Sequence, residues 1–247
     1  MPNDKYRILS TRHLTDSSIA VAGESGIHID VKDFIQIKLV LNEALMGEEN
    51  LFHVFRPEAV HVFTSVNAVK MLAQHYIHQD DTFYVVSKPK ICCISGKTKK
   101  ALQRLFKSGE FLAESPYGSE LGTTIAALGN ITAVNFFCGN IRRNELPDIL
   151  KEAGITVNEF VIYENIPAPV VTATNYDGIL FFSPSAVKSY FSVNQLPAAT
   201  VCFAIGSTTA AALKEYTENK IIMSTNISED DMVQTAIFYF NNINCYE

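Results

Sequence analysis

Hydroxyl side chains follow several apolar runs of this sequence, at the points where helical patterns begin. The five are Ser65, Thr98, Ser183, Thr208 and Thr209. A helix start presents unpaired N–H groups and the positive end of the helix dipole, and a hydroxyl adds a further donor. Such a group can hold carboxylates without a surplus of positive charge. Each hydroxyl taken singly is better explained as a helix cap, but their recurrence at corresponding places favours a site for an anionic small molecule.

Other motifs with possible chemistry are incomplete. Gly96-Lys97-Thr98 resembles the end of a phosphate loop, but the full motif requires glycine where Ile91 stands. No Gly-x-Gly occurs, so the dinucleotide fingerprint is absent. His75 and His78 have helical spacing but no third ligand nearby, which favours a solvated helix end over a metal site. The five cysteines form no CxxC pair, and we expect reduced, buried thiols.

The elements that would position the hydroxyls alternate along the chain. Short β-rich runs are each followed by a small or hydroxylated residue and then a helical pattern, which predicts an α/β protein with parallel sheets covered by helices. These runs are Arg7–Ser10, Val60–Phe63, Ile91–Ile94, Ala133–Phe137, Ile179–Phe182 and Val201–Ile205. In open sheets of this kind the ligand crevice lies at the carboxyl ends of the strands.

An internal repeat divides the chain into two similar lobes. Phe63–Lys70 aligns with Phe181–Lys188, and Gly96–Ala101 aligns with Gly206–Ala211. Either duplication or convergence on one strand-turn-helix solution explains the similarity. Two lobes with the same turns would line a shared cleft with the same donors.

Two long extended segments, Phe34–Val40 and Val157–Ile166, stand between the repeat units. They are either ordinary sheet strands or a two-stranded ladder that joins the lobes. The second interpretation makes lobe 1 discontinuous: residues 1–35 and 166–247 form lobe 1, and residues 36–165 form lobe 2. Thr82–Lys90 fits no repeat unit and is expected to be an insertion or a loop.

Composition limits the classes of partner. The chain has 247 residues, 47% of them hydrophobic and 19% charged, which is ordinary for a globular protein. Its net charge of −6 argues against a nucleic-acid partner, since such proteins face phosphates with excess Lys and Arg. No apolar run is long enough to span a membrane, and Met1–Lys5 does not begin like a signal peptide. We therefore expect a cytoplasmic protein without a membrane partner, and a monomer.

Several short motifs, in order along nearly the whole chain, resemble the uroporphyrinogen-III synthase family. They begin with Ile8–Arg12 and continue through Phe63–Val69, Cys138–Pro147, Val161–Asn165, Phe182–Val187 and Ala204–Leu213. The resemblance implies two flavodoxin-like parallel-sheet domains joined by a two-stranded β linker. It further implies that the first domain is completed by the C-terminal half of the chain.

The resemblance also implies an activity. The family cyclises hydroxymethylbilane, a linear tetrapyrrole, to uroporphyrinogen III, with inversion of the last ring and loss of water. No metal or cofactor takes part. The expected partner is therefore the tetrapyrrole substrate, together with a possible transient contact to the enzyme that supplies it.

Site residues follow from the same motifs. The family's best candidate for assisting the departure of water falls on Tyr163, whose phenol is protonated at pH 7 and can donate a proton. The alternative is that Tyr163 is only a packed aromatic of the linker. The resemblance assigns substrate binding to Arg12, Ser65, Thr98, Arg143, Ser183, Thr208 and Thr209.

Two other functions remain open from the sequence. One is a non-catalytic two-lobed binding protein or regulator on the same scaffold. It would be distinguished by whether Tyr163 and the threonines face a common cleft. The other is a flavodoxin-like protein that binds FMN, which would be yellow when purified.

Overall fold

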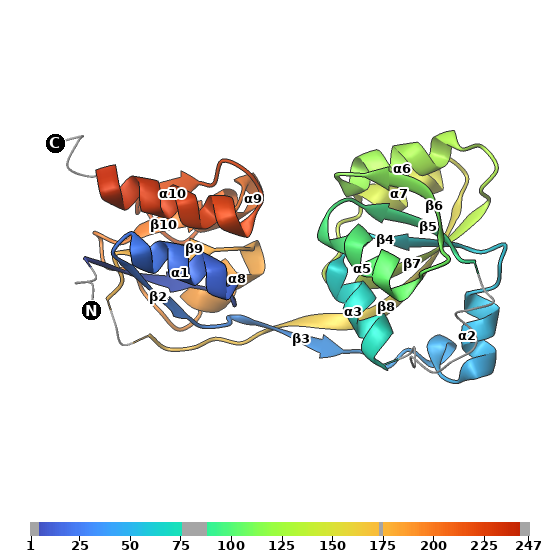
Figure 1. Cartoon of the computed structure of the whole chain (residues 1–247), viewed down its shortest axis with the longest axis horizontal. Helices are drawn as coiled ribbons and strands as arrows, with labels where there is room; N and C mark the ends of the chain where they lie inside the picture. The colour runs from blue at the N-terminus through green and yellow to red at the C-terminus, as the bar shows by residue number, and fades with distance from the viewer. Residues whose placement is uncertain (1–4, 76–87, 173–174, 243–247) are drawn as a thin grey trace. The chain divides into compact units, whose positions relative to one another are not determined.

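The computed structural model describes residues 5–75, 88–172 and 175–242. The chain divides into two compact units (Figure 1): unit 1 comprises Met1–Gln36 and Ile166–Glu247, and unit 2 comprises Ile37–Asn165. The first boundary, between residues 36 and 37, lies one residue after the expected one. Residues 82–87 of the expected insertion lie outside the described residues, and Lys90 begins a strand.

Unit 1 is a parallel sheet with helices on both faces. In sheet order its strands are β2 (Ile27–Val31), β1 (Tyr6–Ser10), β9 (Gly178–Phe181), β10 (Val201–Ala204) and β11 (Ile221–Met223). Numbered within the unit, this is the 2-1-3-4-5 order of flavodoxin. Ile8 packs with α1 (Asp16–Glu24) and α10 (Glu229–Asn242). Its neighbour Leu9 packs on the opposite face with α8 (Pro184–Phe191) and α9 (Ser207–Lys214).

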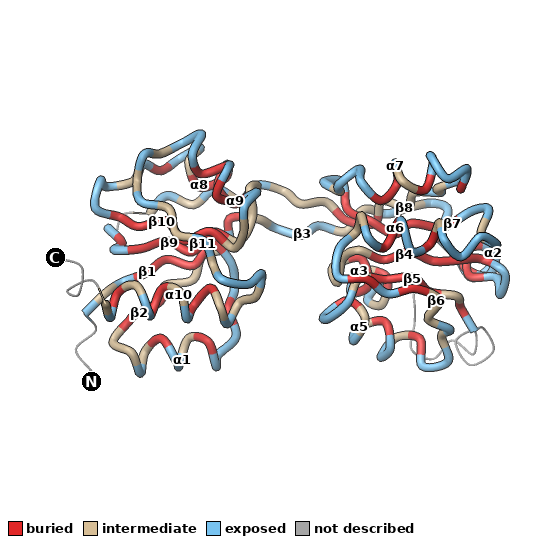
Figure 2. Tube along the Cα trace, turned by 90° about the horizontal axis from the view of Figure 1, so that it is seen from above, coloured by how far each residue is buried: buried red, intermediate tan, exposed pale blue. Residues whose placement is uncertain are grey.

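Unit 2 has the same layers. Its parallel strands, in sheet order, are β8 (Thr156–Pro167), β7 (Ala133–Gly139), β4 (Val60–Phe63), β5 (Lys90–Ile94) and β6 (Glu110–Ser115). One face carries α2 (Glu48–Val54), α3 (Val66–His75) and α5 (Lys97–Leu105), together with a 3-10 turn at Glu43–Leu45. The other carries α6 (Gly118–Ala127) and α7 (Glu145–Glu152). Buried residues run along the strands and the inner sides of these helices (Figure 2).

The strands of the two units have the same spatial order in their sheets, but they follow one another along the chain in a different order. Strands β9, β10 and β11 of unit 1 correspond to β4, β5 and β6 of unit 2, and β1 and β2 correspond to β7 and β8. Unit 2 runs without a break from β4 to β8, whereas unit 1 is interrupted after β2 by the whole of unit 2. The repeated turns of the sequence therefore occupy equivalent places. The turn after β1, with Arg12, is the counterpart of the turn after β7, with Arg143.

The two extended segments pair with each other. β3 (Ile35–Leu39) lies beside β8 at the edge of the unit 2 sheet. The Val40 amide donates to the Ile162 carbonyl at 3.1 Å, and the Ala168 amide donates to the Phe34 carbonyl at 2.9 Å. These bonds define an antiparallel pair, so the segments that connect the units form a ladder.

Helix caps account for part of the hydroxyl pattern. The Ser183 hydroxyl accepts from the Ala186 amide at 3.1 Å at the start of α8, where Pro184 favours a first turn. The Ser65 hydroxyl accepts from the Asn67 amide at 3.1 Å. Both residues therefore stabilise helix starts, whatever else they do.

The described part of the chain contains buried cysteines but no disulfide. Cys92, Cys93, Cys138 and Cys202 are buried and free, while Cys245 lies outside the described range. Of the helices described, none combines the length and apolar character needed to cross a membrane.

A histidine is buried in the core of unit 2 without hydrogen-bond partners. His61, in the middle of β4, is fully buried, and neither ring nitrogen has a partner among the described residues. Its ring packs against Phe55 at a centroid distance of 4.5 Å. Burial, with a smaller contribution from the Arg56 charge, lowers the pKa of His61 from 6.5 to about 3. The folded protein therefore holds this imidazole neutral.

We expect His61 to make the protein sensitive to mild acid. Between pH 6.5 and about 3 the unfolded chain binds a proton at this site and the folded chain does not, so stability falls as the pH is lowered. The slope is about 1.4 kcal/mol per pH unit, or roughly 2 kcal/mol by pH 5. Urea unfolding at pH 7, 6 and 5 should show this loss in the wild type and not in His61→Leu. The exposed His53 provides the control His53→Leu, which should retain it. Parallel pH dependence in wild type and His61→Leu would contradict the assignment.

Candidate functional site

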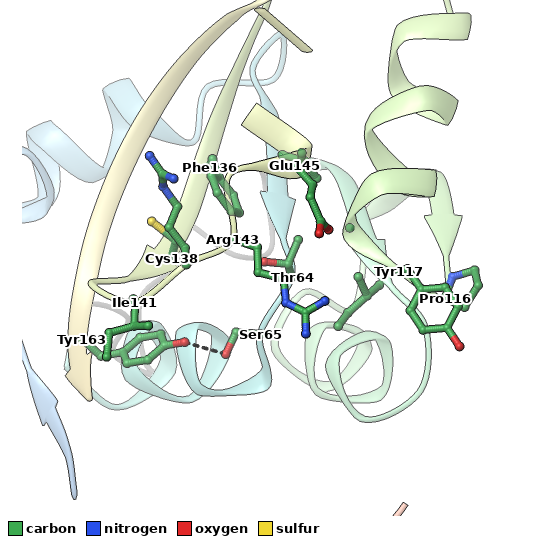
Figure 3. Close-up of a pocket in the computed structure, with 15 residues that line it drawn as sticks. Thr64, Ser65, Pro116, Tyr117, Phe136, Cys138, Ile141, Arg143, Glu145 and Tyr163 are labelled. Carbon is green, nitrogen blue, oxygen red and sulfur yellow. Dashed lines mark hydrogen bonds between the residues drawn. The ribbon is translucent and has the colours of Figure 1, made fainter. Parts of the chain in front are cut away.

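A pocket of about 290 Å³ opens in unit 2 where the strands end. Its polar lining includes Ser65 after β4, Arg143 after β7 and Tyr163 of β8 (Figure 3). β4 and β7 are neighbours in the sheet, and the strands that follow them in the chain lie on opposite sides of this pair. This is the switch point at which open α/β sheets form ligand crevices.

A β-bulge directs Tyr163 into this pocket. The register between β7 and β8 shifts after Cys138, which pairs with Val161, so that Gly139 pairs with Tyr163. Ile162 and Tyr163 are consecutive residues, yet both belong to the core cluster on one face of the sheet. A regular strand would place them on opposite faces. The extra residue in β8 therefore turns the phenol toward Ser65.

Gly139 makes room for the Tyr163 ring. A Cβ atom at residue 139 would lie 2.4 Å and 2.5 Å from two carbons of that ring and 2.9 Å from its oxygen. The ring therefore lies directly against the backbone at the end of β7. Only glycine permits this approach.

The Tyr163 phenol and the Ser65 hydroxyl form a hydrogen-bonded pair. The phenol donates to Ser65 Oγ at 2.9 Å (Figure 3). Ser65 Oγ also accepts from the Asn67 amide, so its own proton is free to donate to a ligand in the pocket. Tyr163 is 6% exposed. Burial raises the pKa of this phenol by more than the Ser65 hydrogen bond lowers it, so the phenol is protonated at neutral pH.

Two adjacent arginines of the turn after β7 differ in their partners. Arg142 donates to both carboxylate oxygens of Glu159, at 2.6 Å from Nε and 2.7 Å from Nη2, and also to Asn144 Oδ1. Arg143 is exposed at the pocket and has no ion pair or hydrogen bond among the described residues. Arg142 therefore holds the turn to β8, while the Arg143 guanidinium is available to an anion.

The Arg142–Glu159 pair is expected to contribute measurably to stability. Both side chains are about three-quarters buried, and a bidentate guanidinium–carboxylate pair is among the stronger ionic contacts. We expect Glu159→Gln to lower the free energy of unfolding by about 1–3 kcal/mol, because Arg142 loses its charge partner. Glu58→Gln, which breaks the exposed Arg56–Glu58 pair, should change it by less than about 1 kcal/mol. Equal effects of the two substitutions in urea unfolding would contradict this prediction.

Three helix starts add polar backbone to the pocket. Residues next to the first turns of α3, α6 and α7 all line it: Ser65, Gly118 and Glu145. Each start directs unpaired N–H groups and a positive dipole end toward its surroundings. Together with Arg143, they suit the pocket to an anionic group.

The structure brings together only some of the residues expected from the sequence. Ser65, Arg143 and Tyr163 line the same pocket. Thr98, near the start of α5, is 3% exposed and does not line it. The Thr98 hydroxyl is therefore buried in this structure, and its expected contact with a substrate stays a prediction.

The remaining four expected residues belong to unit 1. Arg12 pairs with Glu229 at 3.2 Å, and its guanidinium lies over the Phe182 ring at 4.0 Å. Ser183 caps α8, Thr208 is exposed at the start of α9 and Thr209 is 1% exposed. Arg12 is thus already paired, in contrast to its counterpart Arg143.

Residues missed by the sequence analysis complete the pocket. Gly139 lies within the quoted Cys138–Pro147 motif, but nothing local shows that the ring of a residue 24 positions later needs its space. In the sequence, Glu145 has only the pattern of an acidic residue in the first turn of a helix, which is common and indicates no site. Tyr117, 55% exposed, precedes α6. Among the described residues, no group of three or more His, Cys, Asp or Glu side chains could hold a metal ion.

The sequence of this chain matches the model of a known protein family. The model of the family described as uroporphyrinogen-III synthase HemD matches residues 43–234, more than three-quarters of the chain. The uroporphyrinogen-III synthetase of Helicobacter pylori has a similar structure, with a TM-score of 0.69 at 18% identity over 94% of this chain and 99% of that one. A mutant uroporphyrinogen III synthase of Thermus thermophilus follows, with a TM-score of 0.59 at 14% identity over 98% of this chain and 100% of that one.

A search of curated proteins found no match. At these identities the structural neighbours establish a shared fold: an α/β protein with two parallel-sheet domains. The family match is independent of them and covers the Ser65, Arg143 and Tyr163 positions. The chain belongs to the uroporphyrinogen-III synthase HemD family.

Proposed function

We propose that this protein is a uroporphyrinogen-III synthase, a cofactor-independent hydro-lyase. It would cyclise hydroxymethylbilane to uroporphyrinogen III, with inversion of the last pyrrole ring and loss of water. The observation that carries the proposal is the convergence, in one pocket of a chain from this family, of a Tyr163–Ser65 donor pair and an Arg143 that has no partner among the described residues.

The pocket suits one end of such a substrate. Its volume of about 290 Å³ lies at the small end of ligand sites and is far too small for a whole tetrapyrrole. A single pyrrole ring with its acidic side chains is a reasonable occupant. We propose that Arg143 pairs with one of these carboxylates, because no residue in the described part of the chain pairs with its guanidinium and a guanidinium can bind a carboxylate through two hydrogen bonds.

The chemical step needs help for a departing hydroxyl. In this proposal Ser65 donates its free proton toward the hydroxyl oxygen, while the Tyr163 phenol supports Ser65 by donating to it. The C–O bond breaks, water leaves, and the terminal ring becomes a cation. The α-carbon of the last ring that already carries a methylene bridge attacks that cation, the bond to this bridge breaks, and the bridge carbon rejoins the ring at its other α-carbon, which inverts the ring. The proton lost from this other α-carbon replaces the one taken by water. The sum is one tetrapyrrole macrocycle and one water.

Other residues are proposed to bind further carboxylates of the substrate. Ser183 and Thr208 lie beside helix starts in unit 1, where backbone N–H groups are available. Thr209 is proposed to act through the backbone N–H groups at the start of α9. Arg12 is proposed to bind a carboxylate after its release from Glu229. Single substitutions of Thr208 and Arg12 would test these roles by their effect on KM.

The test is a coupled assay with freshly made hydroxymethylbilane. The expected result is formation of isomer III faster than the spontaneous closure to isomer I, measured by chromatography after oxidation of both products to porphyrins. Formation of isomer I alone at the uncatalysed rate would overturn the proposal. If the protein then still binds uroporphyrin tightly, the result would favour a non-catalytic binding protein on the same scaffold.

A further inference from the structure

A single carboxylate stands among the pocket-lining residues that the structure describes. It belongs to Glu145, the first residue of α7. Figure 3 shows its side chain directed toward Thr64, into the space that Arg143 also enters. The other polar lining groups are mostly donors, so a carboxylate here is unexpected in a pocket suited to anions.

No described residue of the protein pairs with the Glu145 carboxylate. It forms no ion pair with Arg142 or Arg143 and accepts no side-chain hydrogen bond from any described residue. A first-turn acid does favour the dipole of α7. That role does not require the side chain to line a pocket, whereas Glu145, although exposed, lines this one and is directed toward Thr64. Its oxygens are therefore available to a ligand that carries a donor or a positive charge.

We propose that Glu145 is a further catalytic residue, which accepts the N–H of the pyrrole ring that loses its hydroxyl and stabilises the cation formed there. This role rests on the proposed function. As the C–O bond breaks, the electron pair of the ring nitrogen moves toward the exocyclic carbon, and the nitrogen becomes positive. No proton moves to Glu145. The N–H group stays intact, and its hydrogen bond to the carboxylate strengthens as charge develops.

Of the three charged residues that line the pocket, Arg142 is paired with Glu159, and the other two then have separate partners in the substrate. Arg143 pairs with a carboxylate of the bound ring, and Glu145 faces its nitrogen. The first contact is present in substrate and transition state alike and contributes to binding. The second is stronger in the transition state than in the ground state, so it contributes to turnover.

The test compares Glu145→Gln with Glu120→Gln. Glu120 is also an acid in the first turn of a unit 2 helix, is exposed, and does not line the pocket, so its replacement removes the same charge from an equivalent position. We expect Glu145→Gln to lower kcat by about ten-fold or more, with KM changed less than about two-fold. Glu120→Gln should leave both constants unchanged. Glu145→Asp, which keeps the charge, should recover part of the lost kcat.

The outcomes separate this role from the proposed function. Wild-type kcat in Glu145→Gln, with an active wild-type enzyme, would overturn the role of Glu145 and leave the proposed function intact. Equal losses of kcat and melting temperature in Glu145→Gln and Glu120→Gln would also overturn it, because they would show a helix-dipole effect. A wild-type protein without turnover would overturn the proposed function, and the role of Glu145 with it.

Discussion

Replacing Tyr163 with phenylalanine is expected to lower kcat by at least ten-fold, with KM nearly unchanged. The substitution keeps the ring against Gly139 and removes only the hydroxyl that donates to Ser65. Assistance by a general acid is typically worth about 10²–10⁴-fold. The lower bound is modest because Ser65 retains its own proton and because water can replace a lost donor in an open pocket.

The same substitution should cost little stability. A single buried hydrogen bond contributes about 1 kcal/mol, which corresponds to a melting temperature lower by roughly 2–4 °C in a chain of this size. Carboxylate binding should persist, since it depends on Arg143 and the helix starts. The measurement is steady-state kinetics with fresh hydroxymethylbilane, together with calorimetry of both proteins.

Ser65→Ala provides the decisive comparison. If the phenol acts through Ser65, then Ser65→Ala lowers kcat at least as much as Tyr163→Phe, and the double variant is no slower than Ser65→Ala alone. Residues that act as a unit show this non-additivity. Multiplicative losses would show that the two hydroxyls act separately. A well-folded Tyr163→Phe protein with wild-type kcat would remove Tyr163 from the catalytic residues.

Replacing Gly139 with alanine is expected to reduce both stability and activity. The new methyl group would lie 2.4 Å from a ring carbon of Tyr163, so the ring or the end of β7 must move. Overpacking of this kind typically costs about 1–3 kcal/mol. Because a displaced ring cannot keep its hydrogen bond to Ser65, kcat should fall at least as far as in Tyr163→Phe. Urea unfolding and steady-state kinetics measure the two effects.

A second substitution tests the cause. In a Tyr163→Leu background the aromatic ring is absent, so Gly139→Ala should there cost much less stability than in the wild type. Gly23→Ala is the matched control, since a Cβ there would meet nothing within 4 Å. That change in α1 should stabilise the protein by about 0.5–1 kcal/mol. If Gly139→Ala lowers the free energy of unfolding as much in the Tyr163→Leu background as in the wild type, the new methyl group clashes with a residue other than Tyr163.

Local sequence was sufficient for the main elements of the fold. The six β-rich runs correspond to β1, β4, β5, β7, β9 and β10, and the helices that follow Ser65 and Ser183 begin where the hydroxyls predict them. Turn chemistry and side-chain periodicity act over a few residues, so such features can be read directly. The strands β2, β6 and β11 were not identified, because their short or mixed patterns depend on burial against neighbours.

The family resemblance assigned eight residues of both lobes to the site, and three of them, Ser65, Arg143 and Tyr163, line one pocket. It assigned Arg143 and not Arg142, but it did not show that the charge of Arg142 is committed to Glu159, a partner 17 residues away. It also assigned a contact to Thr98, a hydroxyl that is buried in the structure. Residue type and order do not determine which polar groups find partners within the protein.

What only the tertiary structure decided is the direction of the side chains at the site. Tyr163 faces Ser65 because a one-residue bulge in β8 reverses the alternation that the sequence of the strand implies. Its ring fits because Gly139, on the neighbouring strand, lacks a Cβ atom. Both depend on the register between strands that are separated in the chain by α7. The sequence determined which residues were available for chemistry, and pairing between distant strands decided which of them meet.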